Sequence, residues 1–111
     1  MITPSGTLFT IPCEAIFNQH ELIYRSALVG VGAPGKQRPV IIAEPWPEKR
    51  PKDGQDKQRL IAELAALGAK HSHTSGIQDF FLMETLPTDI RHNAKIFREK
   101  LAVWAARKLP S

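Results

Sequence analysis

Cysteine is nearly absent from the sequence: Cys13 is the only one, so no disulfide can form within the chain. Secreted domains of this size often depend on disulfides, which favours a reducing compartment here. The first residues lack the basic and apolar segments of a signal peptide. The longest apolar stretch, residues 27–33, is far too short to cross a bilayer. The sequence therefore predicts a soluble, cytoplasmic protein with no transmembrane segment.

Long runs of like charge are also missing. Fifteen basic and eleven acidic residues give a net charge of +4, with small basic groups at residues 48–52 and at the C-terminus. Nucleic-acid-binding domains usually show a longer basic run or a basic stripe interleaved with aromatic residues. No nucleic-acid partner is therefore predicted. The mild positive charge still allows one alternative, a free-standing basic module that binds an acidic partner or RNA.

Several motifs that carry chemistry in other enzymes are absent. Residues 30–32 (Gly-Val-Gly) lie too far from a following helix to form a dinucleotide-binding loop, and there is no nucleophile elbow. His71 and His73 could share one face of a strand, but no third ligand lies near them in sequence, so no metal site is predicted. Cys13 is interpreted as a buried structural residue. Trp46, between two prolines, is either a binding anchor or, more commonly, a cap on the edge of the core.

What remains is an ordinary globular composition, with 42% hydrophobic residues and enough chain for one domain, residues 1–111. Glu14 is expected in the first turn of a helix that begins at Pro12. The patterns predict strands at 7–11, 23–31, 40–43 and 80–83, and further helices at 55–68 and 93–108. Residues 23–31 and 40–43 flank a Pro-Gly turn and should form an antiparallel hairpin. The predicted fold class is α+β, a small sandwich with a central sheet of about three mainly antiparallel strands flanked by helices.

Lys95 stands out on electrostatic grounds. The last predicted helix begins near Asn93, which would place Lys95 in its first turn, with Arg91 and His92 just ahead. Cations are disfavoured at a helix N-terminus, whereas phosphate and carboxylate groups bind there. The cluster is thus interpreted either as an anion-binding site or as solvated side chains at a frayed helix end.

Taken together, several segments resemble the C-terminal domain of the adenylate-forming superfamily, which contains acyl-CoA synthetases, luciferases and nonribosomal adenylation domains. Residues 10–17 (TIPCEAIF) are similar to the motif that opens its first helix, and residues 24–31 and 39–42 resemble the next two strands. Residues 81–87 resemble the strand and Leu-Pro before the superfamily's catalytic lysine. The resemblance covers residues 7–108, and it is most specific to the bacterial β-lactone synthetases of olefin biosynthesis.

This resemblance implies that the chain is the mobile C-terminal (lid) domain of an ATP-dependent, AMP-forming ligase. It assigns the catalytic lysine of carboxylate adenylation to Lys95, with Arg91 and His92 as further candidates for contacts near the phosphate. ATP and Mg²⁺ would be bound mainly by a large N-terminal domain that this chain does not contain, so the chain alone should be inactive and hold no cofactor. Two departures bear on the lysine's reach. Ala94 replaces the usual glycine, and two additional residues separate Pro87 from Lys95.

The resemblance also implies the substrate and partners. The acid would be a long-chain 3-hydroxy acid whose own hydroxyl displaces AMP and closes a β-lactone. The implied partners are the N-terminal adenylation domain, the acid and ATP, with other proteins of olefin biosynthesis as further candidates. A fatty acyl-CoA synthetase, which releases a thioester, remains an alternative because no residue of this chain excludes it.

Overall fold

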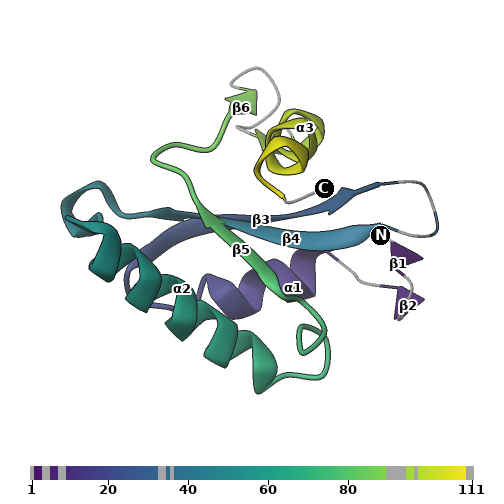
Figure 1. Ribbon diagram of the computed structural model, residues 1–111, viewed down its shortest axis with the longest axis horizontal. Helices are drawn as coiled ribbons and strands as arrows, with labels where there is room; N and C mark the ends of the chain where they lie inside the picture. Colours follow the sequence, from purple (N-terminus) through teal and green to yellow (C-terminus); the bar gives the residue numbers. More distant parts are fainter. Residues whose placement is uncertain are drawn as a thin grey trace.

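The computed structural model describes residues 2–3, 6–7, 10–32, 35, 37–89, 95–96 and 98–109. A three-stranded sheet lies between helices: α1 and α2 cover one face, and α3 covers the other (Figure 1). The elements in chain order are β1 (Ile2–Thr3), β2 (Gly6–Thr7), α1 (Thr10–Phe17), β3 (Ile23–Val31), β4 (Arg38–Pro45), the 3₁₀ turn η1 (Pro47–Lys49), α2 (Gly54–Ala69), β5 (Asp79–Leu82), β6 (Thr88–Asp89), β7 (Lys95–Ile96) and α3 (Arg98–Lys108).

The central sheet has the strand order β3-β4-β5. Strands β3 and β4 pair antiparallel, which confirms the predicted hairpin. Strand β5 pairs parallel with β4, because the connection between them is a crossover through α2 and a parallel pair needs such a connection. The α+β sandwich with three main strands is therefore confirmed, with one of its two strand pairings parallel.

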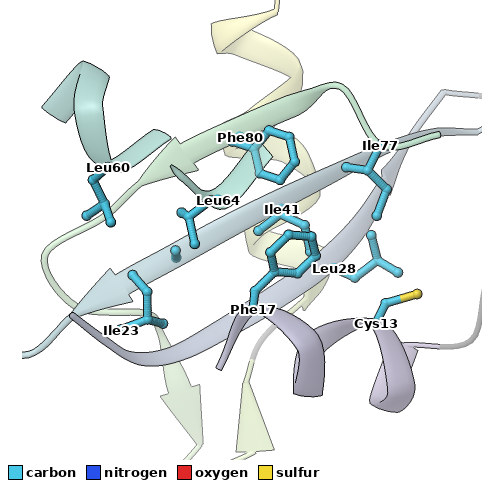
Figure 2. Packing of buried hydrophobic residues seen from close by; sticks show 10 residues of the cluster. Cys13, Phe17, Ile23, Leu28, Ile41, Leu60, Leu64, Ile77 and Phe80 are labelled. Atoms are coloured by element: carbon cyan, nitrogen blue, oxygen red, sulfur yellow. The ribbon is translucent and has the colours of Figure 1, made fainter. Parts of the chain in front are cut away.

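One hydrophobic cluster fills the space between the sheet and helices α1 and α2 (Figure 2). Phe17 lies at its centre, fully buried, with its ring edge-to-face against Phe80 at a centroid distance of 5.5 Å. Since alternate residues of a strand face opposite sides, β3 contributes Leu28 to this cluster. The buried members are Cys13, Phe17, Ile23, Leu28, Ile41, Ala43, Leu60, Leu64, Ile77 and Phe80.

A second cluster lies on the opposite face, beneath α3. Its buried members are Ala27, Val29, Val40, Ile42, Leu86, Leu101 and Ala105. Phe81 and Trp104 pack edge-to-face at its margin, with ring centroids 5.7 Å apart. This cluster fixes α3 on the sheet and buries Leu86, the residue that leads into the short strand β6.

The N-terminal prediction is partly wrong. Thr10 and Ile11 were expected in a strand, but they open α1, while β2 ends at Thr7. Pro12 is therefore the third helical residue, where its missing N–H costs no helical hydrogen bond, because the first four N–H groups have no partner within the helix. Glu14 consequently lies beyond the first turn, and its carboxylate is used in another way, as described below.

The C-terminal helix is shorter than predicted. It begins at Arg98 and not near Asn93, which lies outside the described residues. Across the described part of the chain, none of the helices has the length and apolar character needed to cross a membrane.

Candidate active-site hairpin

Lys95 lies in a short β-hairpin and not in a helix, so the expectation that it occupies the first helical turn is wrong. Strand β7 pairs antiparallel with β6, with Thr88 opposite Ile96 and Asp89 opposite Lys95. Strand pairing and the packing of Ile96 against the cluster beneath α3 hold residues 95–96 extended, and helix α3 begins at Arg98. The helix dipole therefore gives no support to an anion site at Lys95, and its backbone is held by the hairpin instead.

The two further candidates of the sequence analysis, Arg91 and His92, lie outside the described residues. So does Ala94, which stands where the family motif has glycine. The structure therefore does not test whether these residues lie near Lys95, and their role stays a prediction.

The segment between β5 and the hairpin is bonded to the sheet through a buried carboxylate, Glu44 of β4, which is only 4% exposed. Glu44 Oε1 accepts a hydrogen bond from the Leu86 backbone N–H at 2.8 Å and another from Arg25 Nε at 2.7 Å. Arg25 Nη2 also donates to the Leu86 carbonyl oxygen at 3.4 Å. Arg25 stands opposite Glu44 in the β3–β4 register, so the sheet itself brings the two charges together.

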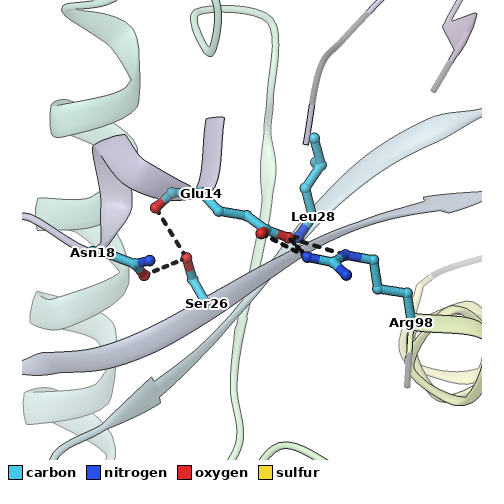
Figure 3. Close-up of polar contacts among 5 residues, drawn as sticks. All are labelled: Glu14, Asn18, Ser26, Leu28 and Arg98. Atoms are coloured by element: carbon cyan, nitrogen blue, oxygen red, sulfur yellow. Dashed lines mark hydrogen bonds and ion pairs between the residues drawn. The ribbon is translucent and has the colours of Figure 1, made fainter. Parts of the chain in front are cut away.

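The chain after the hairpin is bonded through a second buried carboxylate, Glu14 of α1 (Figure 3). Arg98 Nη2 donates to both carboxylate oxygens, at 2.7 and 2.8 Å, and its Nε lies 3.2 Å from Oε2. Glu14 Oε2 also accepts the Leu28 backbone N–H at 2.7 Å. Bidentate arginine–carboxylate pairs fix orientation as well as distance.

The position of Glu14 has a structural reason. Strand β3 is an outer strand of the sheet, so one side of it presents N–H groups that no neighbouring strand accepts. Glu14 accepts one of these, and the Ser26 hydroxyl donates to Asn18 Oδ1 at 2.8 Å along the same edge. The carboxylate thus joins α1, below the sheet, to Arg98 of α3, above it (Figures 1 and 3). The sequence analysis missed this role; a glutamate inside the otherwise apolar run at residues 11–17 was the available signal.

The remaining candidates form no site. Cys13 is 1% exposed within the cluster facing α1 and α2, so its interpretation as a structural residue is confirmed. His73 is exposed, and its backbone oxygen lies 3.6 Å from Cys13 Sγ. In the described portion of the chain, His, Cys, Asp and Glu side chains form no group of three that could hold a metal ion. The rings of Trp46 and Tyr24 are in tilted contact, with centroids 4.5 Å apart and an interplanar angle of 44°, and both residues are more than a third exposed.

Two curated proteins are similar to the chain over nearly its whole length. An olefin beta-lactone synthetase from Xanthomonas campestris pv. campestris is 47% identical over 106 residues, which is 96% of this chain. An olefin beta-lactone synthetase from Stenotrophomonas maltophilia is 43% identical over 107 residues. The chain spans only 18% of the length of each of these relatives. No family model matches the chain.

Solved structures share the fold. A crystal structure of an anthranilate CoA ligase in complex with anthranoyl-AMP superposes with a TM-score of 0.74 at 18% identity, over 98% of this chain and 20% of that protein. At this identity the likeness establishes the fold alone. Together the comparisons support the resemblance found in the sequence: this chain is similar to a limited part of the olefin beta-lactone synthetases and shares the fold of part of an anthranilate CoA ligase.

Proposed function

We propose that this chain is the C-terminal domain of an AMP-forming β-lactone synthetase and that Lys95 is its catalytic residue. The observation that carries the proposal is the 47% identity to an olefin beta-lactone synthetase across 96% of the chain. The same chain covers 18% of that relative, which supports a domain that works together with a larger one. The substrate is a long-chain 3-hydroxy acid, and the larger domain supplies the pockets for ATP and the acid.

In the first step, an oxygen of the substrate carboxylate attacks the α-phosphorus of ATP. The new bond joins carboxylate to phosphorus, the bond to the bridging oxygen breaks, and pyrophosphate leaves. Negative charge shifts over the phosphoryl oxygens during this in-line transfer, and a fixed ammonium group beside them stabilises it. Lys95 supplies that charge, and it also holds the carboxylate against the phosphate, which lowers the entropic part of the barrier.

The hairpin supports this role because an electrostatic catalyst must be held in place before the charge develops. The backbone of Lys95 is paired with Asp89, and the chain on either side is bonded to Glu44 and Glu14. A lysine on an unrestrained loop would lose much of its effect to reorganisation. The hairpin is thus a suitable carrier for a single positive charge.

In the second step, the substrate's own hydroxyl oxygen attacks the acyl carbon, loses its proton, and displaces AMP to close the four-membered lactone ring. We assign no residue of this chain to that step. Mg²⁺ supplies charge neutralisation on the ATP phosphates. The two buried carboxylates, Glu14 and Glu44, do not fit a Mg²⁺ site, because arginines and backbone N–H groups already occupy them.

The test compares wild-type full-length enzyme with Lys95→Ala and Lys95→Arg. Pyrophosphate release would be followed with ATP, Mg²⁺ and a 3-hydroxy fatty acid, and the product identified by mass. Loss of the positioned charge should slow adenylation by about 10²–10³-fold in Lys95→Ala, the loss that follows removal of one electrostatic group. Lys95→Arg keeps the charge and should retain part of the rate. Adenylation at the wild-type rate in Lys95→Ala would show that another group performs this role.

A CoA ligase is the second candidate, because the structural neighbours include CoA ligases such as the anthranilate CoA ligase. The same assay separates the two. With coenzyme A present, a thioester product would establish the ligase, whereas a β-lactone formed equally with and without coenzyme A would establish the synthetase. Steeply salt-dependent binding of RNA by the 111-residue chain, without any adenylation by the full-length enzyme, would instead favour the free-standing basic module.

A further inference from the structure

In the described residues, the chain on each side of the hairpin that carries Lys95 bonds to a buried carboxylate, in addition to the packing of Ile96. Before β6, Glu44 binds the backbone N–H of Leu86. After β7, Glu14 binds the guanidinium of Arg98, three residues beyond Lys95. Both carboxylates are less than a tenth exposed, so neither is an incidental surface contact.

The two carboxylates hold different groups: Glu44 binds a backbone N–H, and Glu14 binds an arginine side chain. Leu86 is itself 1% exposed and belongs to the cluster beneath α3, so apolar packing supports this end in addition to Glu44. On the other side of the hairpin, the Arg98 side chain is 40% exposed and bonds to Glu14. Ile96 and Leu101 pack in the cluster beneath α3, so apolar packing supports this end too. The Glu14–Arg98 pair adds a directional restraint on the chain that leaves β7.

The geometry of that pair is restrictive. Arg98 donates to both oxygens of the Glu14 carboxylate, and the Leu28 N–H donates to Oε2 at 2.7 Å (Figure 3). A rotation of Arg98 or of the first turn of α3 would break at least one of these bonds inside a buried site. Leaving a buried charge without its partner is costly, so the arrangement has one favourable geometry.

We propose that Glu14 and Arg98 are positioning residues, which set the location of Lys95 for adenylation without touching the substrate. The inference rests on the proposed function, because it requires Lys95 to be the catalytic charge. Glu14 lies on α1 and is 81 positions from Lys95 in sequence, yet through Arg98 it determines where β7 ends and α3 begins. Displacement of a catalytic group by about 1 Å can lower a rate by about 10²-fold.

The experiment uses full-length enzyme and measures the two steps separately. Pyrophosphate release reports adenylation, and lactone formation from a synthetic 3-hydroxyacyl-AMP reports the second step. Glu14→Gln keeps the size and one acceptor oxygen but removes the charge that orients Arg98. We expect kcat for adenylation to fall about 10–100-fold with KM for ATP and for the acid changed less than about threefold. The second step should stay within about twofold of wild type, because Lys95 is not assigned to it.

Four further variants serve for comparison. Arg98→Lys keeps the positive charge without the bidentate geometry and should restore adenylation only partly relative to Arg98→Ala. Leu64→Ala removes core packing on the opposite face of the sheet, and it should lower the Tm at least as much as Glu14→Gln while leaving the ratio of the two steps unchanged. Asp79→Asn breaks another bidentate pair, between Arg38 of β4 and Asp79 of β5, and it should affect neither step.

The outcomes are distinguishable. If Lys95→Ala stops adenylation while Glu14→Gln leaves it at the wild-type rate, the positioning role is wrong and the proposed function stands. If Glu14→Gln slows both steps equally, as a loss of folded domain would, the positioning role is also wrong. If Lys95→Ala adenylates normally, both the proposed function and this inference fail.

Discussion

The two faces of the central sheet are filled in different ways. The face covered by α1 and α2 holds a cluster whose large side chains, such as Phe17 and Leu64, are completely buried. The face covered by α3 has a smaller buried group bordered by partly exposed residues, among them Phe81, Ile96 and Trp104. The hairpin with Lys95 belongs to the second face, where Leu86 and Ile96 pack in this cluster and two ion pairs, Arg25–Glu44 and Arg98–Glu14, add polar attachments. Stability is thus concentrated on one face, and the proposed chemistry on the other.

The largest expected effect compares equal truncations on the two faces. Leu64→Ala should lower the free energy of unfolding by about 4 kcal/mol, and Leu101→Ala by about 3 kcal/mol, since partly exposed neighbours near Leu101 can move into the space. Urea unfolding of the chain measures both. Val103→Ala, at a position 56% exposed, is the control and should have little effect. A loss for Leu101→Ala as large as that for Leu64→Ala would contradict the difference between the faces.

A smaller effect tests how tightly the α1/α2 face is packed. A Cβ added at Gly68 would lie 3.0 Å from Phe17 Cζ and 3.1 Å from Cε1. Overpacking should outweigh the gain in helix propensity, so Gly68→Ala should destabilise the chain by about 1 kcal/mol. Gly54→Ala, at the start of α2 with nothing within 4 Å of the new Cβ, should instead stabilise it by about 0.5 kcal/mol.

Thermal denaturation measures the effects of Gly68→Ala and Gly54→Ala. Combining Gly68→Ala with Phe17→Leu should produce favourable coupling, because the smaller side chain frees the space that the methyl group needs. Strict additivity of the two changes would mean that Phe17 and Gly68 are not in tight contact, and the packed character of this face would be wrong.

The smallest effect is expected where charges meet in solvent. Asp79→Asn removes the partner of Arg38, and exposed ion pairs contribute little to stability. The hydrogen bond from Arg38 to Asp79 raises the pKa of that guanidinium. A raised pKa adds stability that is present below the ordinary arginine pKa and is lost only above it. Plots of the unfolding free energy against pH for wild type and Asp79→Asn should therefore run parallel around neutral pH. Curves that diverge there would show that the Arg38–Asp79 pair contributes more to stability than an exposed ion pair.

The sequence predicted most of what lies on the α1/α2 face. The residues 23–31 form β3 as expected, since a β-branched and apolar run of that length favours a buried strand, and α2 has the apolar spacing of an amphipathic helix. The parallel pairing of β5 could not be read, because it depends on the path of the crossover. Local sequence patterns thus predicted the individual strands and helices better than their arrangement in the sheet.

The hairpin escaped sequence reasoning for a physical reason. Asn93 is a good N-cap by local propensity, but the pairing of β6 with β7 and the Glu14–Arg98 bonds delay the helix to Arg98. Both are long-range interactions, which no local pattern contains. Lys95 was a candidate already from the basic residues around it, the family resemblance gave it the catalytic role, and the structure showed that its backbone pairs in a hairpin.

The most direct measurement is the rate of each step in full-length Lys95→Ala. Pyrophosphate release from ATP and a 3-hydroxy fatty acid would be compared with lactone formation from the pre-formed acyl adenylate, in the mutant and in wild type. The account predicts that the first rate falls by about 10²-fold or more while the second stays near wild type, because the hairpin presents its charge to the phosphate only during adenylation. Adenylation at the same rate in Lys95→Ala and wild type would contradict the central claim. A lower rate in both steps would mean that Lys95 maintains the fold or acts throughout the reaction.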